Sequence, residues 1–160
     1  MDKKLKDSLS KIKLLICDID GVLTDGSFIK STSGEELRSF NALDGVGFVV
    51  LRLLDLNVKT AWITGRESLT TTQRAEELQI DDVYNGVIRK IDAYNELKKK
   101  YELSDSEVCF IGDDIIDIPI LEKVGFAVSV PNAPKYLSLI HISEPTRRRG
   151  ISYAVVCLKK

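Results

Sequence analysis

The sequence contains few of the residues that build disulfide-bonded or zinc-binding proteins. It has three cysteines, at positions 17, 109 and 157, and a single histidine at position 141. Cys17 and Cys109 lie singly inside apolar runs, and no pair of cysteines has the short spacing of a zinc motif. We therefore expect reduced cysteines in a protein of the cytoplasm, where disulfides are rare.

The chain also lacks the patterns of nucleic-acid-binding proteins and of membrane proteins. Its formal net charge is −1, and no basic stripe is interleaved with aromatic residues. No apolar segment approaches the length of a membrane span, and residues 1–7 lack the apolar core of a signal peptide. We expect neither nucleic acid nor a membrane as a partner.

What the chain does contain is a regular alternation of short apolar runs and helical patterns. Its 160 residues suffice for one domain with a buried core. Strands are predicted at residues 12–17, 58–63, 83–84, 108–111 and 126–130, and helices at residues 46–56, 67–78, 90–101 and 115–123. This order predicts an α/β fold with a doubly wound parallel sheet. Residues 22–40, which include Gly26 and Gly34, are predicted to form a β-hairpin flap after the first strand.

Two acidic clusters follow predicted strands. Asp18 and Asp20 end the first apolar run, and a second group, Asp113, Asp114 and Asp117, follows a later strand. Like charges about 4–6 Å apart repel each other, so such groups are usually kept for a cation or for proton chemistry. Ligands of open parallel sheets bind beyond the carboxyl ends of the strands. The two clusters therefore predict one shared metal site at that edge.

Two further motifs supply the remaining groups that a phosphoryl-transfer site needs. Thr64-Gly65-Arg66 follows a predicted strand, and Lys90 opens a predicted helix. One carboxylate can attack phosphorus to form an aspartyl phosphate, and a second can protonate the leaving oxygen and then activate water. Mg²⁺ prefers hard oxygen ligands, and a lysine adds a second positive centre. The motifs therefore indicate phosphoryl-transfer chemistry with Mg²⁺.

These motifs give the chain a resemblance to a known family. It resembles haloacid dehalogenase-type phosphohydrolases, and more closely the 3-deoxy-D-manno-octulosonate 8-phosphate phosphatase family, which also embraces N-acylneuraminate 9-phosphate phosphatase domains. The similarity runs from residue 11 to residue 136. The matching segments are residues 18–26, 34–37, 40–41, 44–47, 63–66, 83–86, 90–93 and 112–114.

The resemblance implies a role for each residue of the predicted centre. Asp18 would be the nucleophile, and Asp20 would be the general acid and base. Thr64 would hydrogen-bond the phosphoryl oxygens, and Lys90 would stabilise their charge. Mg²⁺ would be held by Asp18, by the backbone carbonyl of Asp20, and by Asp113.

The resemblance also implies residues that surround this centre. Asp114 and Asp117 would support it without binding the metal directly, or would reach the metal through water, and Asp117 would orient Lys90. Gly65 and Arg66 would contact the substrate. For Arg66, recognition of a substrate carboxylate and a structural ion pair are two open interpretations.

The spacing leaves no room for the cap domain that members of this superfamily often carry. Residues 24–58 hold only a hairpin and one helix, and residues 66–90 hold one helix and one short strand. An uncapped site is open to water unless something covers it. The resemblance to a tetrameric family implies that the hairpin at residues 22–40 contacts a neighbouring subunit, with Asp25, Phe28 and Lys30 as candidate contacts. Asp25 is also a candidate substrate-binding residue.

The resemblance implies hydrolysis of a sugar-acid phosphate in lipopolysaccharide synthesis, with 3-deoxy-D-manno-octulosonate 8-phosphate as the first candidate. N-acylneuraminate 9-phosphate and other sugar phosphates are alternatives. A receiver-type signalling domain is an alternative of another class, because it is also doubly wound and phosphorylated on an aspartate. Asp44, near a predicted helix start, is either an N-cap or a functional residue.

Residues 137–160 differ in character from the rest of the chain. Residues 137–147 match the in-frame translation of a transposase-type sequencing adapter, and residues 151–158 match that of a flow-cell primer except at Val156. We therefore predict a phosphatase domain over residues 1–136, whose native C-terminus is missing. The remaining segment is predicted to be adapter-derived, so its histidine and its run of arginines carry no functional role.

Overall fold

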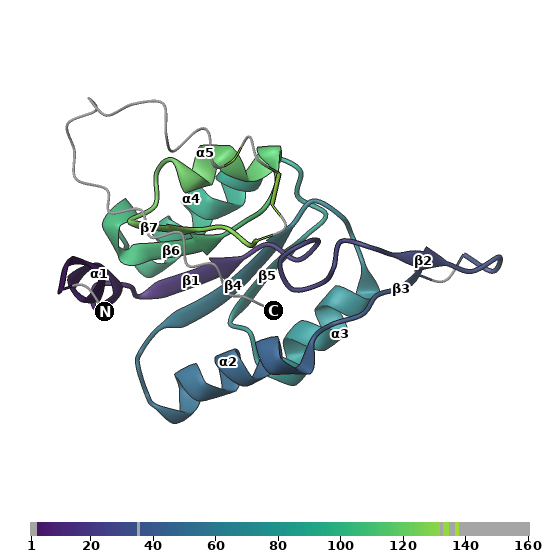
Figure 1. The fold of residues 1–160 in the computed structure, drawn as a ribbon, viewed down its shortest axis with the longest axis horizontal. Helices are drawn as coiled ribbons and strands as arrows, with labels where there is room; N and C mark the ends of the chain where they lie inside the picture. Colours follow the sequence, from purple (N-terminus) through teal and green to yellow (C-terminus); the bar gives the residue numbers. More distant parts are fainter. Residues whose placement is uncertain (1–2, 35, 132, 135–136, 138–160) are drawn as a thin grey trace.

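The computed structural model describes residues 3–34, 36–131, 133–134 and 137. They contain a five-stranded parallel sheet in the order β5-β4-β1-β6-β7 (Figure 1). The strands are β1 (Leu14–Cys17), β4 (Lys59–Thr64), β5 (Asp82–Asn85), β6 (Val108–Ile111) and β7 (Phe126–Val128). The first strand of the sequence therefore lies at the centre of the sheet, with two strands on each side of it.

Helices cover both faces of this sheet, which confirms the predicted doubly wound α/β fold. They are α4 (Lys90–Tyr101) and α5 (Ile118–Leu121) on one face, and α2 (Ala42–Leu53) and α3 (Leu69–Leu78) on the other (Figure 1). Successive side chains of a strand point to opposite faces of a sheet. In β1, Leu14 and Ile16 accordingly pack in the core beneath α4, whereas Cys17 packs in the core beneath α2 and α3.

Between β1 and β4, the described residues form a hairpin and α2, with no further domain. β2 (Ile29–Lys30) pairs antiparallel with β3 (Glu36–Leu37), and the hairpin projects from the body of the domain (Figure 1). Phe40 at the base of the hairpin stacks on Trp62 of β4, with 6.4 Å between ring centroids. Phe48 of α2 meets the same indole edge-on at 5.7 Å. These contacts anchor the hairpin to the core on the α2 side of the sheet.

The start of α2 differs from the prediction because of a side-chain cap. The helix begins at Ala42, four residues earlier than expected, and the Asn41 side chain accepts a hydrogen bond from the Leu43 amide at 2.9 Å. Such a bond satisfies one of the free amides at a helix start. Asn41 is therefore the N-cap, and Asp44 lies inside the first turn.

The remaining helical elements are short. They are α1 (Lys3–Leu9), which the sequence pattern did not predict, and two 3-10 turns, η1 (Asp105–Glu107) and η2 (Ile115–Asp117). Together η2 and α5 replace the single helix predicted at residues 115–123, and Pro119 lies at the start of α5, where its missing amide has no helical partner to lose. In the described part of the chain, no helix combines the length and the apolar character that crossing a membrane requires.

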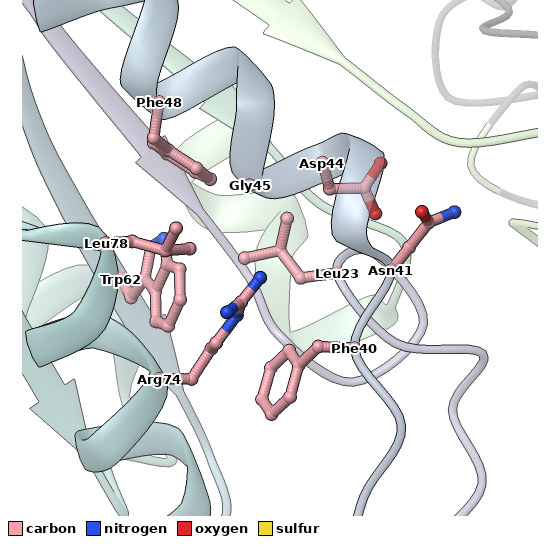
Figure 2. Close-up of a pocket in the computed structure, with 9 residues that line it drawn as sticks. All are labelled: Leu23, Phe40, Asn41, Asp44, Gly45, Phe48, Trp62, Arg74 and Leu78. Carbon is pink, nitrogen blue, oxygen red and sulfur yellow. The ribbon is translucent and has the colours of Figure 1, made fainter.

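A small hollow lies between α2, α3 and the base of the hairpin (Figure 2). Its lining residues are Leu23, Phe40, Asn41, Asp44, Gly45, Phe48, Trp62, Arg74 and Leu78. Arg74 of α3 reaches across it toward α2, and a Cβ at Gly45 would come within 2.9 Å of the Arg74 Nη2. The glycine thus lets the two helices approach, and the hollow belongs to their packing.

Candidate active site

Three charged side chains meet at the carboxyl edge of the sheet. Asp18 directly follows β1, Lys90 is the first residue of α4, and Asp117 ends η2. The Lys90 Nζ lies 2.7 Å from Asp18 Oδ1 and 2.7 Å from Asp117 Oδ1. The side chains are 1%, 5% and 0% exposed for Lys90, Asp18 and Asp117 respectively. Salt in solution therefore screens these ion pairs only weakly.

The second oxygen of Asp117 holds the turn that carries Asp113 and Asp114. The Asp117 Oδ2 accepts a hydrogen bond from the backbone amide of each of these two residues, both at 3.1 Å. Gly112 permits this arrangement, because a Cβ there would lie 2.7 Å from Asp117 Oδ2. Both oxygens of Asp117 are thus engaged within the protein, one with Lys90 and one with the turn.

Asp113 brings a further carboxylate beside Asp18. One oxygen each of Asp18, Asp113 and Asp117 lies within 4.8 Å of the others. The Asp113 Oδ1 is buried and accepts no hydrogen bond from the protein. Gly21, with φ of +92°, borders this carboxylate so closely that a Cβ would collide with Asp113 Oδ2. Hard oxygen atoms, one of them buried and unsatisfied, are a donor set that fits Mg²⁺.

The cluster holds more negative charge than its one lysine compensates. Burial raises the pKa of Asp18 to about 7, although Lys90 pulls it downward. Burial also raises the pKa of Asp113 to about 6, with further contributions from Asp117 and Asp114. For Lys90, burial favours the neutral form, but its two aspartate partners outweigh that effect and raise its pKa. A divalent cation would relieve the repulsion and favour the ionised carboxylates.

Asp20 lies on the turn after Asp18 and faces two arginines. Its Oδ1 lies 3.2 Å from Arg38 Nη1, and its Oδ2 lies 3.8 Å from Arg66 Nε. The Oδ1 is buried and accepts no hydrogen bond from the protein, so the contact with Arg38 is an ion pair without hydrogen-bond alignment. The Asp20 side chain is 29% exposed, which leaves it accessible to a substrate oxygen or to water.

The loop after β4 brings the third predicted motif to the same edge. Thr64 ends β4 and is fully buried, and its Oγ1 accepts a hydrogen bond from the Arg66 amide at 3.3 Å. Gly65 between them is half-buried. The Arg66 guanidinium stacks 3.9 Å from the centre of the Phe28 ring on the hairpin side. Arg66 therefore links this loop to the hairpin and to Asp20, while recognition of a substrate carboxylate stays a prediction.

Two of the predicted residues lie outside the buried cluster. Asp25 is exposed before the hairpin, and its Oδ1 accepts hydrogen bonds from the Ser27 amide at 2.9 Å and from the Ser27 hydroxyl at 2.6 Å. Asp114 is exposed as well, and it caps η2 by accepting a hydrogen bond from the Ile115 amide at 2.6 Å. Both carboxylates therefore stabilise local turns rather than join the ion pairs around Lys90.

Comparison with known proteins identifies the family. Residues 55–154 match haloacid dehalogenase-like hydrolases. The chain belongs to this hydrolase family. It is 42% identical over 124 residues to the 3-deoxy-D-manno-octulosonate 8-phosphate phosphatase of Yersinia pestis, covering 78% of this chain and 65% of that relative. For the phosphatase of Escherichia coli K12, identity is 40% over 122 residues, covering 76% and 64%. The chain thus spans slightly less than two thirds of the length of these relatives.

Solved structures of such phosphatases have the same fold as this chain. The crystal structure of the Yersinia pestis phosphatase matches with a TM-score of 0.84 and 33% identity, over 98% of this chain and 78% of that chain. The Moraxella catarrhalis phosphatase, solved in complex with magnesium, phosphate and KDO, matches with a TM-score of 0.79 and 34% identity, over 84% and 76%. The resemblance read from the sequence motifs is confirmed.

One part of the candidate site escapes prediction from the sequence. The Arg38 side chain is 0% exposed and pairs with both Asp20 and Glu36. The signal for it is the alternation around β3, where exposed Leu37 separates two inward-facing charged residues. Alternation shows that Arg38 faces inward, but it does not show which carboxylate Arg38 meets.

Proposed function

We propose that this chain is a Mg²⁺-dependent phosphomonoesterase that releases phosphate from 3-deoxy-D-manno-octulosonate 8-phosphate. The proposal rests chiefly on the buried Lys90 ammonium held between Asp18 and Asp117 at the carboxyl edge of the sheet. Fixed positive charge beside an aspartate nucleophile favours the approach of an anionic phosphate. The activity named for the Yersinia pestis and Moraxella catarrhalis relatives supports this substrate.

Hydrolysis would proceed in two steps on Asp18. First, an Asp18 oxygen attacks phosphorus, the bond from phosphorus to the sugar oxygen breaks, and Asp20 gives its proton to that oxygen. Second, Asp20 takes a proton from a water molecule, which attacks the aspartyl phosphate, releases inorganic phosphate and restores Asp18. Throughout, Lys90 balances the charge of the phosphoryl oxygens, and the Thr64 hydroxyl donates a hydrogen bond to one of them.

Asp18 and Asp113 would hold Mg²⁺, together with the backbone carbonyl of Asp20. The buried and unsatisfied Oδ1 of Asp113 supports this ligand set. Asp117 supports the site instead of ligating, because its oxygens already accept hydrogen bonds from Lys90 and from the turn. When bound, Mg²⁺ would offset the repulsion between the Asp18 carboxylate and the substrate phosphate.

The test is a phosphate-release assay with three substrates, each with Mg²⁺ or with EDTA. The substrates are 3-deoxy-D-manno-octulosonate 8-phosphate, N-acylneuraminate 9-phosphate and a neutral hexose 6-phosphate. We expect the highest kcat/KM for the first and loss of turnover with EDTA. A preference for the second would replace the proposed substrate. Retention of the phosphoryl group on Asp18 without release would favour a receiver-type signalling role instead.

We further propose that the chain assembles as a homotetramer in which residues 22–40 contact a neighbouring subunit. Exposed apolar side chains along one side of α2 and on the hairpin support this. They are Leu43, Val46, Val50 and Leu53 on α2, and Ile29 and Leu37 on the hairpin. An exposed apolar patch on a protein surface marks an interaction site. Sedimentation velocity tests the proposal, and a monomer at micromolar concentration would contradict it.

A cytoplasmic location is part of the same proposal. The buried cysteines Cys17 and Cys109 are both free, as expected for a protein kept in a reducing compartment. Fractionation of cells that express the chain, followed by immunodetection, tests the location. Recovery in an oxidising compartment would contradict it.

We propose that residues 137–160 originate from sequencing adapter and not from the gene. The match of residues 137–147 to a translated adapter supports this origin. Of this segment, the structure describes only Leu137, which is buried against the core beneath α4. Sequencing the genomic DNA beyond the codon for Tyr136 tests the proposal, and an uninterrupted natural frame that encodes the segment would contradict it.

A further inference from the structure

The strand that returns from the hairpin directs alternate side chains toward the body of the domain. Glu36 and Arg38 face inward, with side chains that are 18% and 0% exposed. Leu37 between them is 60% exposed. Phe40, the next residue in this alternation, stacks on Trp62 of the central sheet. The contact between these rings anchors the chain two residues after Arg38 to the central sheet.

Arg38 occupies a position where one guanidinium serves several partners. Its Nε donates to Glu36 Oε1 at 2.9 Å, and its Nη1 donates to Thr71 Oγ1 of α3 at 3.2 Å. The same Nη1 lies 3.2 Å from Asp20 Oδ1. Planar guanidinium presents its donors in a fixed fork, so two bonds determine where the third contact points. Glu36 and Thr71 therefore fix the position of the charge that faces Asp20.

We propose that Arg38 is a positioning residue that holds the Asp20 carboxylate in place for proton transfer. The proposal rests on the proposed function, in which Asp20 gives and takes the proton. Arg38 does not touch the reacting atoms in this role, because it acts through Asp20. The hairpin of the same subunit thereby supports the active site through Asp20, in addition to any contact it makes with a neighbour.

The charge balance around Asp20 supports this role. When Asp20 is ionised, it and Glu36 are negative and Arg38 and Arg66 are positive, so the four side chains form a neutral group. Arg66 is the weaker partner of Asp20, at 3.8 Å and with a side chain that is 39% exposed. Among the ion pairs in the described part of the chain, removal of Arg38 would leave the Asp20 carboxylate with only the longer contact to the partly exposed Arg66. A displacement of about 1 Å in such a group costs about 100-fold in rate.

The first experiment compares single variants in the octulosonate 8-phosphate assay with Mg²⁺. We expect R38M to lower kcat by about 10- to 100-fold while KM changes by less than about threefold. R38K should recover part of the loss, because it keeps the charge without the fork. R52M is the matched control, since Arg52 lies in the last turn of α2 and donates a hydrogen bond to the Leu78 carbonyl at the end of α3. The kcat of R52M should stay within about twofold of wild type.

T71V provides a test that does not depend on the stability of R38M. Valine is similar in size to threonine, but it removes the hydrogen bond that Arg38 Nη1 donates, and it leaves every charge in place. We expect kcat to fall by about 3- to 10-fold with little change in the thermal midpoint, because the guanidinium loses one of its two anchors. An unchanged kcat in both T71V and R38M would overturn the proposal.

The second experiment is a double-mutant cycle of Arg38 with Asp20. If Arg38 acts through Asp20, R38M should slow the D20N enzyme by less than about twofold, although it slows the wild-type enzyme by at least about tenfold. Equal losses in both backgrounds would show that Arg38 acts elsewhere and would overturn the proposal. A KM that rises more than about tenfold at constant kcat would do the same, because it would mean direct substrate contact.

The cycle also separates the inference from the function on which it rests. If D20N retains the wild-type rate, Asp20 does not transfer the proton, and the proposed mechanism fails before the role of Arg38 arises. If D20N is slow and R38M is not, the mechanism stands and only the role of Arg38 is wrong.

Discussion

The floor of the site and the hairpin beside it are built on opposite physical principles. We call the cluster of Lys90 with Asp18, Asp113 and Asp117 the floor of the site. Its charged groups are largely shielded from water, and Lys90 is 1% exposed between two aspartates. The hairpin instead exposes apolar side chains, with Ile29 at 65% and Leu37 at 60%. Fixed charges stabilise a charged reactant most strongly where water is excluded. Exposed apolar surface instead favours binding of a partner that covers it. The floor is therefore suited to chemistry and the hairpin to recognition.

This difference has a consequence for stability. Buried charges are costly unless they are paired. In the floor three carboxylates lie close together, and Lys90 pairs with two of them, Asp18 and Asp117. The hairpin carries no such cost, because its apolar side chains are already in water. Substitutions in the floor should therefore change activity and stability strongly, and substitutions on the hairpin surface should change chiefly assembly.

The largest effect is expected from removal of the proposed nucleophile, Asp18. D18N should lower kcat with Mg²⁺ by at least about 10³-fold, because the amide cannot attack phosphorus. The measurement is steady-state phosphate release. D92N is the control, since Asp92 is 56% exposed and forms an ion pair with Arg89 on α4, and it should stay within about twofold of wild type. Turnover by D18N near the wild-type rate would refute the mechanism.

The next effect concerns the ion pairs of Lys90. K90M should lower the free energy of unfolding by about 3–5 kcal/mol at pH 8, because Asp18 and Asp117 would lose their buried partner. K59M is the control, since the Lys59 side chain is 49% exposed in its pair with Asp81, and it should cost at most about 1 kcal/mol. Urea denaturation measures both. Equal losses would remove the contrast between floor and surface.

A smaller effect is expected in the pH dependence of stability without metal. The folded pKa of Asp18 is raised from its ordinary value of 3.8 to about 7, so the folded state holds this proton more tightly than the unfolded chain. Stability from this group is therefore fully present below about pH 4 and is lost as the pH rises through about 7. Asp113, with a pKa raised to about 6, acts in the same direction.

The measurement is the free energy of unfolding in EDTA between pH 4 and pH 8. The difference between D18N and wild type should increase in favour of the variant across this range, because asparagine has no charge to bury. Addition of Mg²⁺ should restore wild-type stability at pH 8, since the cation binds the ionised carboxylates of the folded state. A pH-independent difference in the free energy of unfolding between the two proteins would show that burial does not raise the pKa of Asp18.

The smallest effect on stability is expected on the hairpin. L37S should change the free energy of unfolding of the subunit by no more than about 0.5 kcal/mol, because Leu37 is 60% exposed. Assembly should nevertheless weaken, and sedimentation velocity would show a shift to smaller species. I88S is the control, since Ile88 is 72% exposed in the loop before α4. An unchanged oligomer in L37S would remove the hairpin from the interface.

Much of the sheet and of its floor is predictable from the sequence. The predicted bounds of β6 and α4 agree with the structure, because an apolar run and a helical pattern have distinct periods. The meeting of Asp18, Lys90 and Asp113 also follows from the sequence. Parallel strands bring their carboxyl ends to one edge, so residues placed just after strands, or opening the helices that follow, must gather there.

Other features depend on contacts between distant segments. The pairing of Arg38 with Asp20 requires the hairpin to fold back until Phe40 reaches Trp62. The early start of α2 depends on which of two polar side chains turns toward a free amide, and Asn41 takes this place instead of Asp44. Local patterns do not specify such choices, because the competing alternatives have similar local energies.

The sequence by itself determined the family, the parallel arrangement of the strands and the residue types at the site. Motif spacing and hydrophobic period are local properties of the chain. Only the tertiary structure decided the state of those residues. It buried Lys90 between two carboxylates and raised the pKa of Asp18 to about 7. It also brought Arg38 to Asp20 across the hairpin. Burial and distance between remote segments set electrostatic energies, and these exist only once the chain has folded.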